Sequence, residues 1–318
     1  MQAQSKQPPT GGMRAVQLHS FGGPEVLNVC EIPAPEAGPG QIRVRVTAAG
    51  LNPMDWIMTA DADAAARFGL TLPAGFGTDY AGVVDQVGDG VTGFAPGDRV
   101  FGGALSRAVA DFVVVDSAGG TAANEVHHTP DGVDDRTAAT LTIAGRTASA
   151  ALAAVNPGPD DTLLVGGASG GVGVFAVQLA RVSGARVIGT GSAASADHLR
   201  ALGAEPVVYG HGLADRVRAL APNGITAAID LHGMETVHVA RELGVPDSRI
   251  CTIAAQVDGV AAANGANAAP GVLEEIACLV AAGHLRVPVA ARFPIEQIRS
   301  AAALQAGRHV QGKVVIDL

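Results

Sequence analysis

A glycine-rich turn between an apolar strand and an apolar helix constrains the fold of this chain more than any other feature. The turn reads Gly167-Ala168-Ser169-Gly170-Gly171-Val172-Gly173 and directly follows the apolar run 163–165. In such a turn, Gly170 lets a pyrophosphate approach the backbone, Gly173 lets the helix pack on the strand, and the helix N-terminus attracts the anion. Residues 168–173 are therefore predicted to bind a dinucleotide, with Ala168 in place of the pattern's first glycine. A tight turn without a ligand is the alternative interpretation.

Short apolar strands and helices alternate after the break Pro157-Gly158-Pro159. The pattern predicts strands at residues 162–165, 186–190, 207–208, 225–230 and 249–253, with helices at about 171–182, 196–202 and 213–220. Alternation of this kind requires right-handed crossovers and produces a parallel sheet. The predicted fold class is therefore α/β, with a doubly wound parallel sheet of the Rossmann type.

The chain before residue 116 has the pattern of short strands separated by turns. Ile42, Val44 and Val46 alternate with polar residues, and glycine and proline mark turns at 38–40 and 96–98. This pattern predicts a β-rich, partly barrel-like unit. An alanine-rich stretch at 134–155 has helical character, and the chain ends with a predicted helix from residue 301 and a closing strand at 313–317. Residues 1–12 are polar and are predicted to form a flexible tail.

The end of the second predicted strand indicates which dinucleotide is bound. An acidic residue there would bond the ribose 2′-hydroxyl of NAD, but the first carboxylate, Asp197, lies inside the next helix. The site accommodates a 2′-phosphate better, with Ser192 and Ser195 as neutral donors and His198 and Arg200 as cations. The expected cofactor is NADPH. An exposed helix face is the alternative interpretation of His198 and Arg200.

The composition argues against several classes of function. The 318-residue chain has a net charge of −9, which disfavours nucleic acid and anionic membranes as partners, because both attract basic surfaces. No apolar run approaches the ~18 to 20 residues of a membrane helix. Cys30, Cys251 and Cys278 are too scattered for a disulfide framework or a thiolate zinc site, which fits a reducing, cytoplasmic setting. Lys313 is the only lysine after Lys6, so Schiff-base catalysis is disfavoured.

Further motifs extend over nearly the whole chain from Met13. They read Ala49-Gly50-Leu51-Asn52-Pro53-Met54-Asp55, Gly77-Thr78-Asp79-Tyr80-Ala81-Gly82-Val83-Val84, Val87-Gly88-Asp89-Gly90-Val91, Gly97-Asp98-Arg99-Val100 and Gly312-Lys313-Val314-Val315. Together with the glycine-rich turn, this set resembles the quinone oxidoreductase, or zeta-crystallin-like, branch of the medium-chain dehydrogenase/reductase family. The resemblance implies a GroES-like catalytic domain at 13–135 and 290–318 and a Rossmann NADPH-binding domain at 136–289.

The resemblance also implies hydride transfer without a metal. Zinc-dependent members of the family place a cysteine at or beside Asn52 and a His-Glu pair where this chain has Thr78 and Asp79, and they carry a four-cysteine zinc lobe. Alcohol oxidation is disfavoured without a Lewis acid, whereas a quinone or an α,β-unsaturated carbonyl spreads the incoming charge. The expected activity is NADPH-dependent reduction of a small-molecule quinone or enone, in a homodimer or homotetramer.

The same resemblance implies roles for individual residues. Asn52 is expected beside the nicotinamide, where its amide orients a substrate carbonyl; a structural bond to backbone is the alternative. Thr147, Gly312 and Lys313 are expected on the phosphate side of the cofactor, although the segment before Thr147 departs from the family pattern. Tyr80 is a candidate proton donor or, alternatively, a buried core residue.

Two questions stay open at the level of sequence. The adjacent His127 and His128 suggest a metal ligand pair, but neighbours on an extended segment face opposite ways and no ligand cluster accompanies them, so no metal site is predicted. The second question is the reaction. An enoyl-thioester reductase of a biosynthetic pathway would use the same hydride chemistry, and a non-catalytic NADPH-binding protein would show the same turn.

Overall fold

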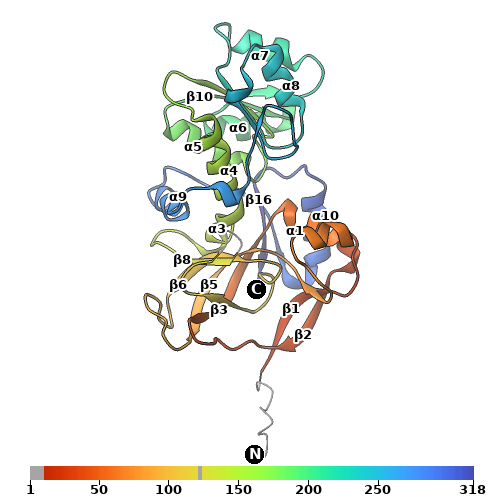
Figure 1. The fold of residues 1–318 in the computed structure, drawn as a ribbon, viewed down its shortest axis with the longest axis vertical. Helices are drawn as coiled ribbons and strands as arrows, with labels where there is room; N and C mark the ends of the chain where they lie inside the picture. The colour runs from red at the N-terminus through yellow and green to blue at the C-terminus, as the bar shows by residue number, and fades with distance from the viewer. Residues whose placement is uncertain (1–10, 121–123) are drawn as a thin grey trace, which may run out of the picture. The chain divides into compact units, whose positions relative to one another are not determined.

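The chain forms two units in the computed structural model, which describes residues 11–120 and 124–318 (Figure 1). The first unit runs to Thr140 and also contains Ala291–Ala306 and Val314–Leu318; the second contains Leu141–Ala290 and Gly307–Lys313. Residues 1–10 of the predicted tail lie outside the described residues. Gly12, which the sequence places in the tail, already begins strand β1 (Gly12–Leu18), because it pairs with Pro33.

Two β-sheets form the first unit. Their remaining strands are β2 (Asn28–Pro33), β3 (Gln41–Leu51), β4 (Ala74–Gly75), β5 (Asp79–Val87), β6 (Arg99–Ala104), β7 (Phe112–Asp116), β8 (Asn124–His128), β15 (Val289–Pro294) and β16 (Lys313–Asp317). The smaller sheet has the order β2-β1-β4, and the larger has the order β15-β16-β3-β5-β6-β8 with β7 paired to β3. The helices are α1 (Pro53–Ala60), α2 (Ala62–Arg67), α3 (Asp135–Ala138) and α10 (Ile298–Ala306). The β-rich unit predicted from the sequence is confirmed.

Strand β3 shows how the sequence pattern becomes structure. Ile42, Val44 and Val46 are at most 3% exposed, as their alternation predicts. A shift in the pairing with β5 follows Val46, and the strand after it is buried on both faces. Gly50 fits there because it lacks a side chain: a Cβ would lie 2.1 Å from the Ala139 carbonyl oxygen.

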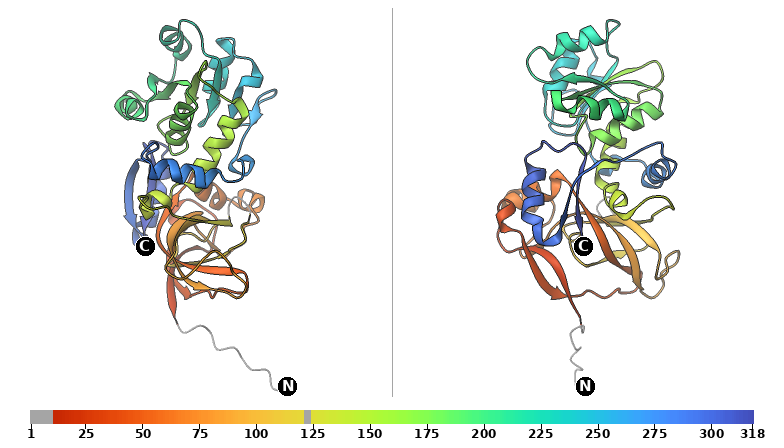
Figure 2. Two further views of the ribbon diagram at one scale, coloured as in Figure 1. Left: turned by 90° about the vertical axis from the view of Figure 1, so that its left-hand side faces the viewer. Right: turned by 180° about the vertical axis from the view of Figure 1, so that it is seen from behind.

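A parallel six-stranded sheet with helices on both faces forms the second unit (Figures 1 and 2). Its strands are β9 (Thr162–Gly166), β10 (Arg186–Gly191), β11 (Glu205–Val208), β12 (Ala227–Asp230), β13 (Ile250–Thr252) and β14 (Ala261–Ala262). Its helices are α4 (Thr142–Val155), α5 (Gly173–Val182), α6 (Ala196–Leu202), α7 (Leu213–Leu220), α8 (Glu235–Glu242) and α9 (Val272–Ala281).

The strand order of this sheet is β11-β10-β9-β12-β13-β14. The chain moves outward from β9 to β11 and then returns to β12 on the other side of β9, so its direction reverses between β9 and β12. Ligands of doubly wound sheets bind at the carboxyl ends of the strands at such a reversal. The predicted Rossmann fold is confirmed, and it points to the glycine-rich turn after β9.

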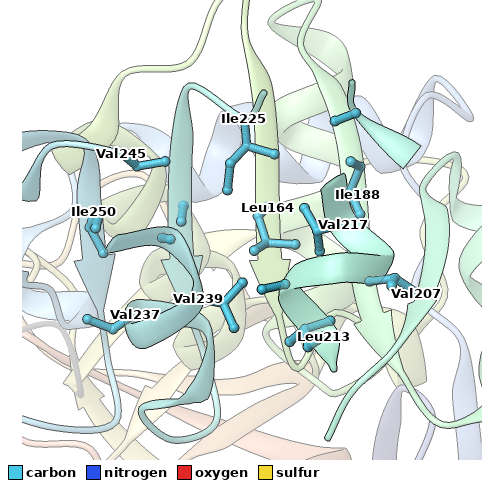
Figure 3. Packing of buried hydrophobic residues seen from close by; sticks show 14 residues of the cluster. Leu164, Ile188, Val207, Leu213, Val217, Ile225, Val237, Val239, Val245 and Ile250 are labelled. Atoms are coloured by element: carbon cyan, nitrogen blue, oxygen red, sulfur yellow. The ribbon is translucent and has the colours of Figure 1, made fainter. Parts of the chain in front are cut away.

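Helices α7 and α8 cover one face of the sheet (Figure 3). Leu164 of β9 and Ile188 of β10 are fully buried in a cluster with Val217 of α7 and Val237 of α8. Helices α4 and α5 pack against each other, and α5 packs on β9 and β10. Every apolar residue of β9 is buried, which explains why this strand is a continuous apolar run rather than an alternating one.

Several boundaries differ from the predicted ones for local reasons. The stretch 134–155 forms two helices, because a tight turn separates them: the Thr140 N–H donates to the Thr137 carbonyl at 3.0 Å, three residues back rather than the four of an α-helix. The second unit accordingly begins at residue 141 rather than 136. Residues 307–313 belong to this unit and not to the β-rich one, because the Gly312 N–H donates to Ser169 and the Lys313 N–H to Pro288.

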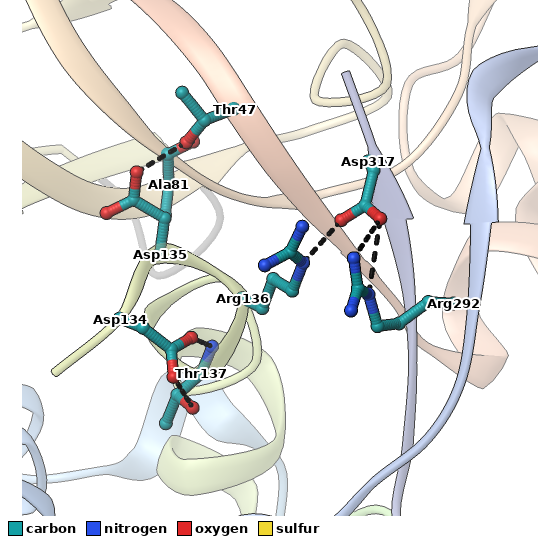
Figure 4. A network of polar contacts seen from close by, with 8 residues as sticks. All are labelled: Thr47, Ala81, Asp134, Asp135, Arg136, Thr137, Arg292 and Asp317. Atoms are coloured by element: carbon teal, nitrogen blue, oxygen red, sulfur yellow. Dashed lines mark hydrogen bonds and ion pairs between the residues drawn. The ribbon is translucent and has the colours of Figure 1, made fainter.

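A carboxylate on the C-terminal strand joins three segments of the first unit (Figure 4). Asp317 on β16 accepts a bond from Arg136 at 2.7 Å and one from Arg292 at 2.8 Å. Burial opposes ionisation of Asp317, but the two arginine bonds outweigh it, so its pKa lies below its ordinary value. The start of α3 is fixed as well, since Asp134 accepts the Thr137 N–H at 2.8 Å.

Replacing Asp317 with Asn is expected to lower the free energy of unfolding by about 1 kcal/mol near neutral pH, because two partly exposed ion pairs are lost. A carboxylate whose pKa is depressed in the folded state stabilises the fold above its unfolded pKa. That contribution disappears as pH falls through the folded-state value, below the ordinary 3.8. Urea titrations of the wild type and of Asp317→Asn at neutral and acid pH measure the difference in the free energy of unfolding. This difference should become smaller at acid pH.

The matched control for this substitution is Asp197→Asn, because the side chain of Asp197 is 98% exposed. It is expected to change the free energy of unfolding by less than the Asp317 substitution does. A difference for Asp317→Asn that stays the same at every pH would show that the charge of Asp317 does not stabilise the fold.

Candidate functional site

A cavity of about 370 Å³ lies at the carboxyl ends of β9, β10 and β12 in the second unit. Several separate segments line it, namely Gly167, Ser169 and Gly170; Thr190, Gly191, Ser192 and Ser195; Tyr209; Asp230, His232, Gly233, Met234, Glu235 and Thr236; and Arg308, His309, Val310 and Gln311. Four residues predicted to bind a cofactor, Ser169, Gly170, Ser192 and Ser195, are among them. The cavity occupies the reversal point of the sheet, where doubly wound folds bind ligands.

The glycine-rich turn is fixed by backbone bonds and stays open toward the cavity. Gly167 has a φ of +68°, which favours glycine, and its N–H donates to the Thr190 hydroxyl at 3.0 Å. A Cβ on Gly170 would meet only the Gly167 carbonyl, at 3.4 Å, whereas a Cβ on Gly173 would lie 2.4 Å from the Ala168 carbonyl oxygen. Gly170 therefore leaves space for a ligand, and Gly173 lets the helix pack against the turn.

The neighbouring strand accommodates Ala168 at the first-glycine position. Ala168 is fully buried, and its Cβ lies 2.9 Å from the position that a Cβ on Gly189 would take. Gly189 thus makes the space that Ala168 fills. Gly171 does the same for Lys313, whose Cδ lies 3.1 Å from a Cβ placed on Gly171. Val172 follows as the N-cap residue of α5.

Two serine hydroxyls follow the end of β10. The Oγ atoms of Ser192 and Ser195 are 3.2 Å apart, and both residues line the cavity. Ser195 is buried and donates to the Ser192 carbonyl at 2.8 Å, so the Ser192 hydroxyl is the outer one of the pair. The first carboxylate of the following helix, on Asp197, is exposed to solvent. A ligand at the end of β10 therefore meets hydroxyl groups from this segment.

His198 and Arg200 lie outside the cavity lining. Arg200 bonds to Asp197 at 2.7 Å on the exposed face of α6. His198 bonds to the backbone of Ser169, and burial together with the charge of Arg286 lowers its pKa. The His198 imidazole is therefore neutral near pH 7. This geometry favours a supporting role for His198 beneath the turn and a surface ion pair for Arg200 over the predicted phosphate contacts.

The loop between β12 and α8 lines another part of the cavity. Asp230 ends β12 and is 2% exposed, and its carboxylate accepts three backbone N–H bonds of 2.9 to 3.0 Å, from His232, Gly233 and Thr236. A carboxylate bonded in this way fixes the conformation of the loop. The loop therefore presents its side chains to the cavity from a rigid backbone.

Glu235, at the start of α8, reaches the far side of the cavity. Its Oε1 accepts the Gly210 N–H at 2.9 Å, and the neighbouring Tyr209 donates its N–H to the Gly191 carbonyl at 3.2 Å. Because β10 and β9 separate β11 from β12, the Glu235 bond runs across the strand ends, whereas the Tyr209 bond joins the ends of the neighbouring strands β11 and β10. They join the loops that enclose the cavity.

The segment before β16 completes the lining. Arg308 has a left-handed φ of +55° and lines the cavity with the three residues that follow it. Gly312 has a φ of +103° and donates its N–H to the Ser169 carbonyl at 3.0 Å. Lys313 is 3% exposed and lies against Gly171. The structure thus brings the predicted Gly312 and Lys313 to the glycine-rich turn.

Thr147 lies on α4, outside the cavity lining. Its hydroxyl donates to the Ile143 carbonyl at 2.6 Å, one helical turn earlier. Its Oγ1 also lies 3.4 Å from the position of a Cβ on Gly265. The hydroxyl that was predicted to contact a phosphate therefore has a backbone partner in its own helix.

Asn52, in the first unit, belongs to a buried hydrogen-bond network. Its Nδ2 donates to Asp79 at 2.9 Å, its N–H donates to Asp55 at 2.7 Å, and Thr78 donates to the other Asp55 oxygen at 2.8 Å. All four residues are at most 2% exposed. Zinc sites of this kind are built from thiolate and imidazole ligands, and this network contains neither; its two carboxylates, Asp55 and Asp79, accept hydrogen bonds from Asn52 and Thr78 instead. The network holds the start of α1.

Tyr80 and the two adjacent histidines also have structural partners. Tyr80 is fully buried and donates to the Glu125 carbonyl at 3.2 Å, and burial raises its pKa, so it is a core residue that stays protonated. His127 bonds to the Glu125 carboxylate at 3.0 Å, and His128 stacks on Phe94. Within residues 11–120 and 124–318, no three His, Cys, Asp or Glu side chains gather in a metal-binding group.

Several lining residues were not found from the sequence. Asp230 could have been found, because it ends the strand next to the glycine-rich strand, where binding residues concentrate. Arg308 and His309 come from a segment far along the chain, and no local pattern marks them.

In the described part of the chain, no helix combines the length and apolarity needed to cross a membrane.

Comparison with known proteins assigns both units. The family model for the alcohol dehydrogenase GroES-like domain matches residues 38–133, and that for zinc-binding dehydrogenase matches residues 171–283. The quinone oxidoreductase of Sus scrofa is 30% identical over 242 residues, which cover 73% of this chain and 70% of that protein. That of Rattus norvegicus is 37% identical over 183 residues, 56% of this chain and 52% of that protein, so the chain spans about half the length of this relative.

Two further comparisons concern the reaction and the cofactor. A pikromycin polyketide synthase component of Streptomyces venezuelae is 44% identical over 174 residues, 54% of this chain and 4% of that protein. A mycobacterial protein solved in complex with NADPH has a TM-score of 0.82 and 26% identity, covering 96% of this chain and all of that one. From the two matched domains and the relatives, the chain belongs to the zeta-crystallin-like quinone oxidoreductase branch of the medium-chain dehydrogenase/reductase family.

Proposed function

We propose that this chain reduces a quinone or an α,β-unsaturated carbonyl with NADPH and without a metal ion. The observation that carries the proposal is the cavity at the reversal point of the parallel sheet, lined by open glycine backbone and by serine hydroxyls. When bound there, the nicotinamide would supply the hydride. The quinone oxidoreductases among the relatives support the acceptor, and the NADPH complex of the mycobacterial neighbour supports the cofactor.

The cavity residues fit such a dinucleotide. Gly170 leaves its cavity side open for a pyrophosphate, and the N-terminus of α5 adds a partial positive charge. Ser192 offers a hydroxyl and Arg308 a guanidinium to a 2′-phosphate. Glu235, a carboxylate in the same lining, accepts a backbone N–H from Gly210. Hydroxyl groups rather than a carboxylate at the end of β10 favour NADPH over NADH.

Asn52 is proposed to orient the substrate carbonyl. The bond from Nδ2 to Asp79 at 2.9 Å fixes the plane of the Asn52 amide. A positioned donor stabilises the negative charge that develops on a carbonyl oxygen during hydride addition. A quinone or enone delocalises that charge, so fewer donors are needed than for an isolated carbonyl.

We also propose that two or four copies assemble and that the protein works in the cytoplasm. The outermost strand of the parallel sheet, β14, has both of its residues exposed, and an open strand edge of this kind can pair with a second copy. The three cysteines are unpaired with one another, which suits a reducing compartment.

The purified protein is expected to oxidise NADPH when a quinone or an enone is added, and to prefer NADPH to NADH by about tenfold or more in kcat/KM, because a charged contact to the 2′-phosphate is worth at least that much. The loss of nicotinamide absorbance measures both rates, with acceptor-free samples as the control. A chelator should leave the rate unchanged. Zinc bound in stoichiometric amount and lost together with activity would contradict the metal-free reaction.

A second candidate is an enoyl-thioester reductase, which the match to the polyketide synthase component favours. Turnover of enoyl thioesters but not of quinones or simple enones would support it. Tight NADPH binding without turnover of any acceptor would instead support a non-catalytic binding protein.

A further inference from the structure

We propose that Arg216 is a positioning residue for the adenine end of the cofactor: it fixes the loop that carries Tyr209, so that the Tyr209 ring stacks on the adenine. The proposal rests on the proposed function and adds to it how the adenine is recognised. Arg216 lies on α7, outside the cavity lining, whereas Tyr209 lines the cavity.

Arg216 holds the loop between β11 and α7 through four backbone bonds. Its guanidinium donates to the carbonyl oxygens of Val208 at 3.0 Å, Tyr209 at 3.3 Å, Gly210 at 2.9 Å and His211 at 2.8 Å. Two glycines of this loop, Gly210 and Gly212, have left-handed φ values of +90° and +79°. Because glycine loses more conformational freedom on ordering than any other residue, such a loop depends on contacts from outside to keep one conformation.

The loop lies beside the end of β10, where the 2′-phosphate is proposed to bind. The Tyr209 N–H donates to the Gly191 carbonyl at 3.2 Å, and Gly191 directly precedes Ser192, the hydroxyl proposed to meet that phosphate. The 2′-phosphate and the adenine are attached to the same ribose, so the adenine lies one sugar ring away from the phosphate. A residue bonded to Gly191 is therefore within reach of the adenine.

Two large apolar side chains are exposed at this part of the cavity. Tyr209 is 49% exposed and Met234 is 41% exposed, and both line the cavity. Their loops are joined directly beside them, because Gly210 donates its N–H to Glu235 at 2.9 Å. The backbone N–H and carbonyl of Tyr209 already have hydrogen-bond partners, so its ring is the part that is left to contact a ligand.

The chemistry of these two side chains fits a nucleobase. Aromatic side chains stack on bases, and a methionine sulfur makes favourable contacts with aromatic rings. The phosphates and riboses of the cofactor need polar partners, so the adenine is the group that matches Tyr209 and Met234. A ring that is already held in place loses less freedom when the base binds, which is how Arg216 acts without touching the cofactor.

Calorimetry with the full chain and adenosine 2′,5′-bisphosphate tests the proposal. This probe carries the adenine and the 2′-phosphate but no nicotinamide, so its binding does not depend on turnover. Tyr209→Ser is expected to weaken binding about tenfold, whereas Tyr209→Phe, which keeps the ring, should stay within about twofold of the wild type. Arg216→Gln is expected to weaken binding about fivefold.

A double variant tests whether Arg216 acts through the Tyr209 ring. In the Tyr209→Ser background, Arg216→Gln is expected to weaken binding by less than about twofold, because the ring that the loop positions is gone. Arg218→Gln is the matched control, since Arg218 lies on the same helix but bonds to Asp215 and Glu242; it should leave binding unchanged. No loss from Arg216→Gln, or the same loss with and without the ring, would overturn the positioning role.

The Tyr209 variants separate this inference from the function on which it rests. If the wild type binds the probe but Tyr209→Ser binds it equally well, or if Tyr209→Phe loses as much as Tyr209→Ser, the stacking role is wrong and the NADPH proposal stands. If the wild type does not bind the probe, the proposed cofactor is wrong and the role of Arg216 fails with it.

Discussion

Gly173→Ala is expected to destabilise the protein by about 3 kcal/mol and to abolish dinucleotide binding, because it forces a methyl group into packed backbone. The new Cβ would lie 2.4 Å from the Ala168 carbonyl oxygen and 2.5 Å from that of Gly167, and neither atom belongs to a side chain that can turn away. Gly173 is the buried first residue of α5, so either the helix or the turn has to move. Thermal unfolding and an NADPH titration of the same sample measure the two losses.

Gly170→Ala is the matched control, in the same turn and with the same added methyl. Its Cβ would meet only the Gly167 carbonyl, at 3.4 Å, which is ordinary van der Waals contact. The fold should therefore change by less than about 1 kcal/mol, whereas NADPH affinity should fall about tenfold, because the methyl group occupies the ligand side. Equal stability of the two variants would show that Gly173 does not pack as described.

The elements with strong local signals were predicted to the residue. Helices α6 and α7 and strand β16 have the predicted bounds, and α5 differs only at its start. The end of α6 illustrates the reason: Leu202 completes the apolar face, and Gly203 follows in the left-handed conformation with a φ of +93°. Where apolar spacing and a terminating glycine agree, the local sequence suffices.

Boundaries that depend on a single tight turn or on distant contacts were not predictable in this way. The division between α3 and α4 is a tight turn at Thr140, which the alanine-rich pattern does not mark. The placement of residues 307–313 in the second unit depends on backbone bonds to Ser169 and Pro288, more than 20 residues away in each case. Neither effect leaves a periodic pattern in the sequence.

The residues of the candidate site show the same difference between what the local sequence indicates and what only the folded chain brings together. Ser169, Gly170, Ser192 and Ser195 were found because a known turn and the end of the next strand lie close in sequence. That His198 binds the phosphate stays a prediction; in the structure its imidazole bonds to the backbone of Ser169, and the residue lies outside the cavity lining. Arg308 and His309 were missed, since only the folded chain brings them to the cavity.

Asp230→Ala is expected to lower the free energy of unfolding by about 4 kcal/mol and to weaken NADPH binding by about a hundredfold or more. The substitution removes the acceptor of three backbone N–H groups at a residue that is 2% exposed, and each buried donor left without a partner costs about 1 to 3 kcal/mol. The loop from β12 to α8 lines the cavity, so losing its fixed conformation also removes part of the ligand site. Urea unfolding and cofactor titration measure the two effects.

Two companion substitutions make the Asp230 result specific. Asp230→Asn keeps an oxygen for His232 and Gly233 but turns an N–H donor toward Thr236, so its loss should be intermediate. Asp215→Ala removes a carboxylate of the same unit that is 82% exposed and bonds only to Arg218 among its described contacts. It should change the free energy of unfolding by less than about 0.5 kcal/mol. If Asp230→Ala unfolds like Asp215→Ala, the three amide bonds do not hold the loop, and its rigidity has another source.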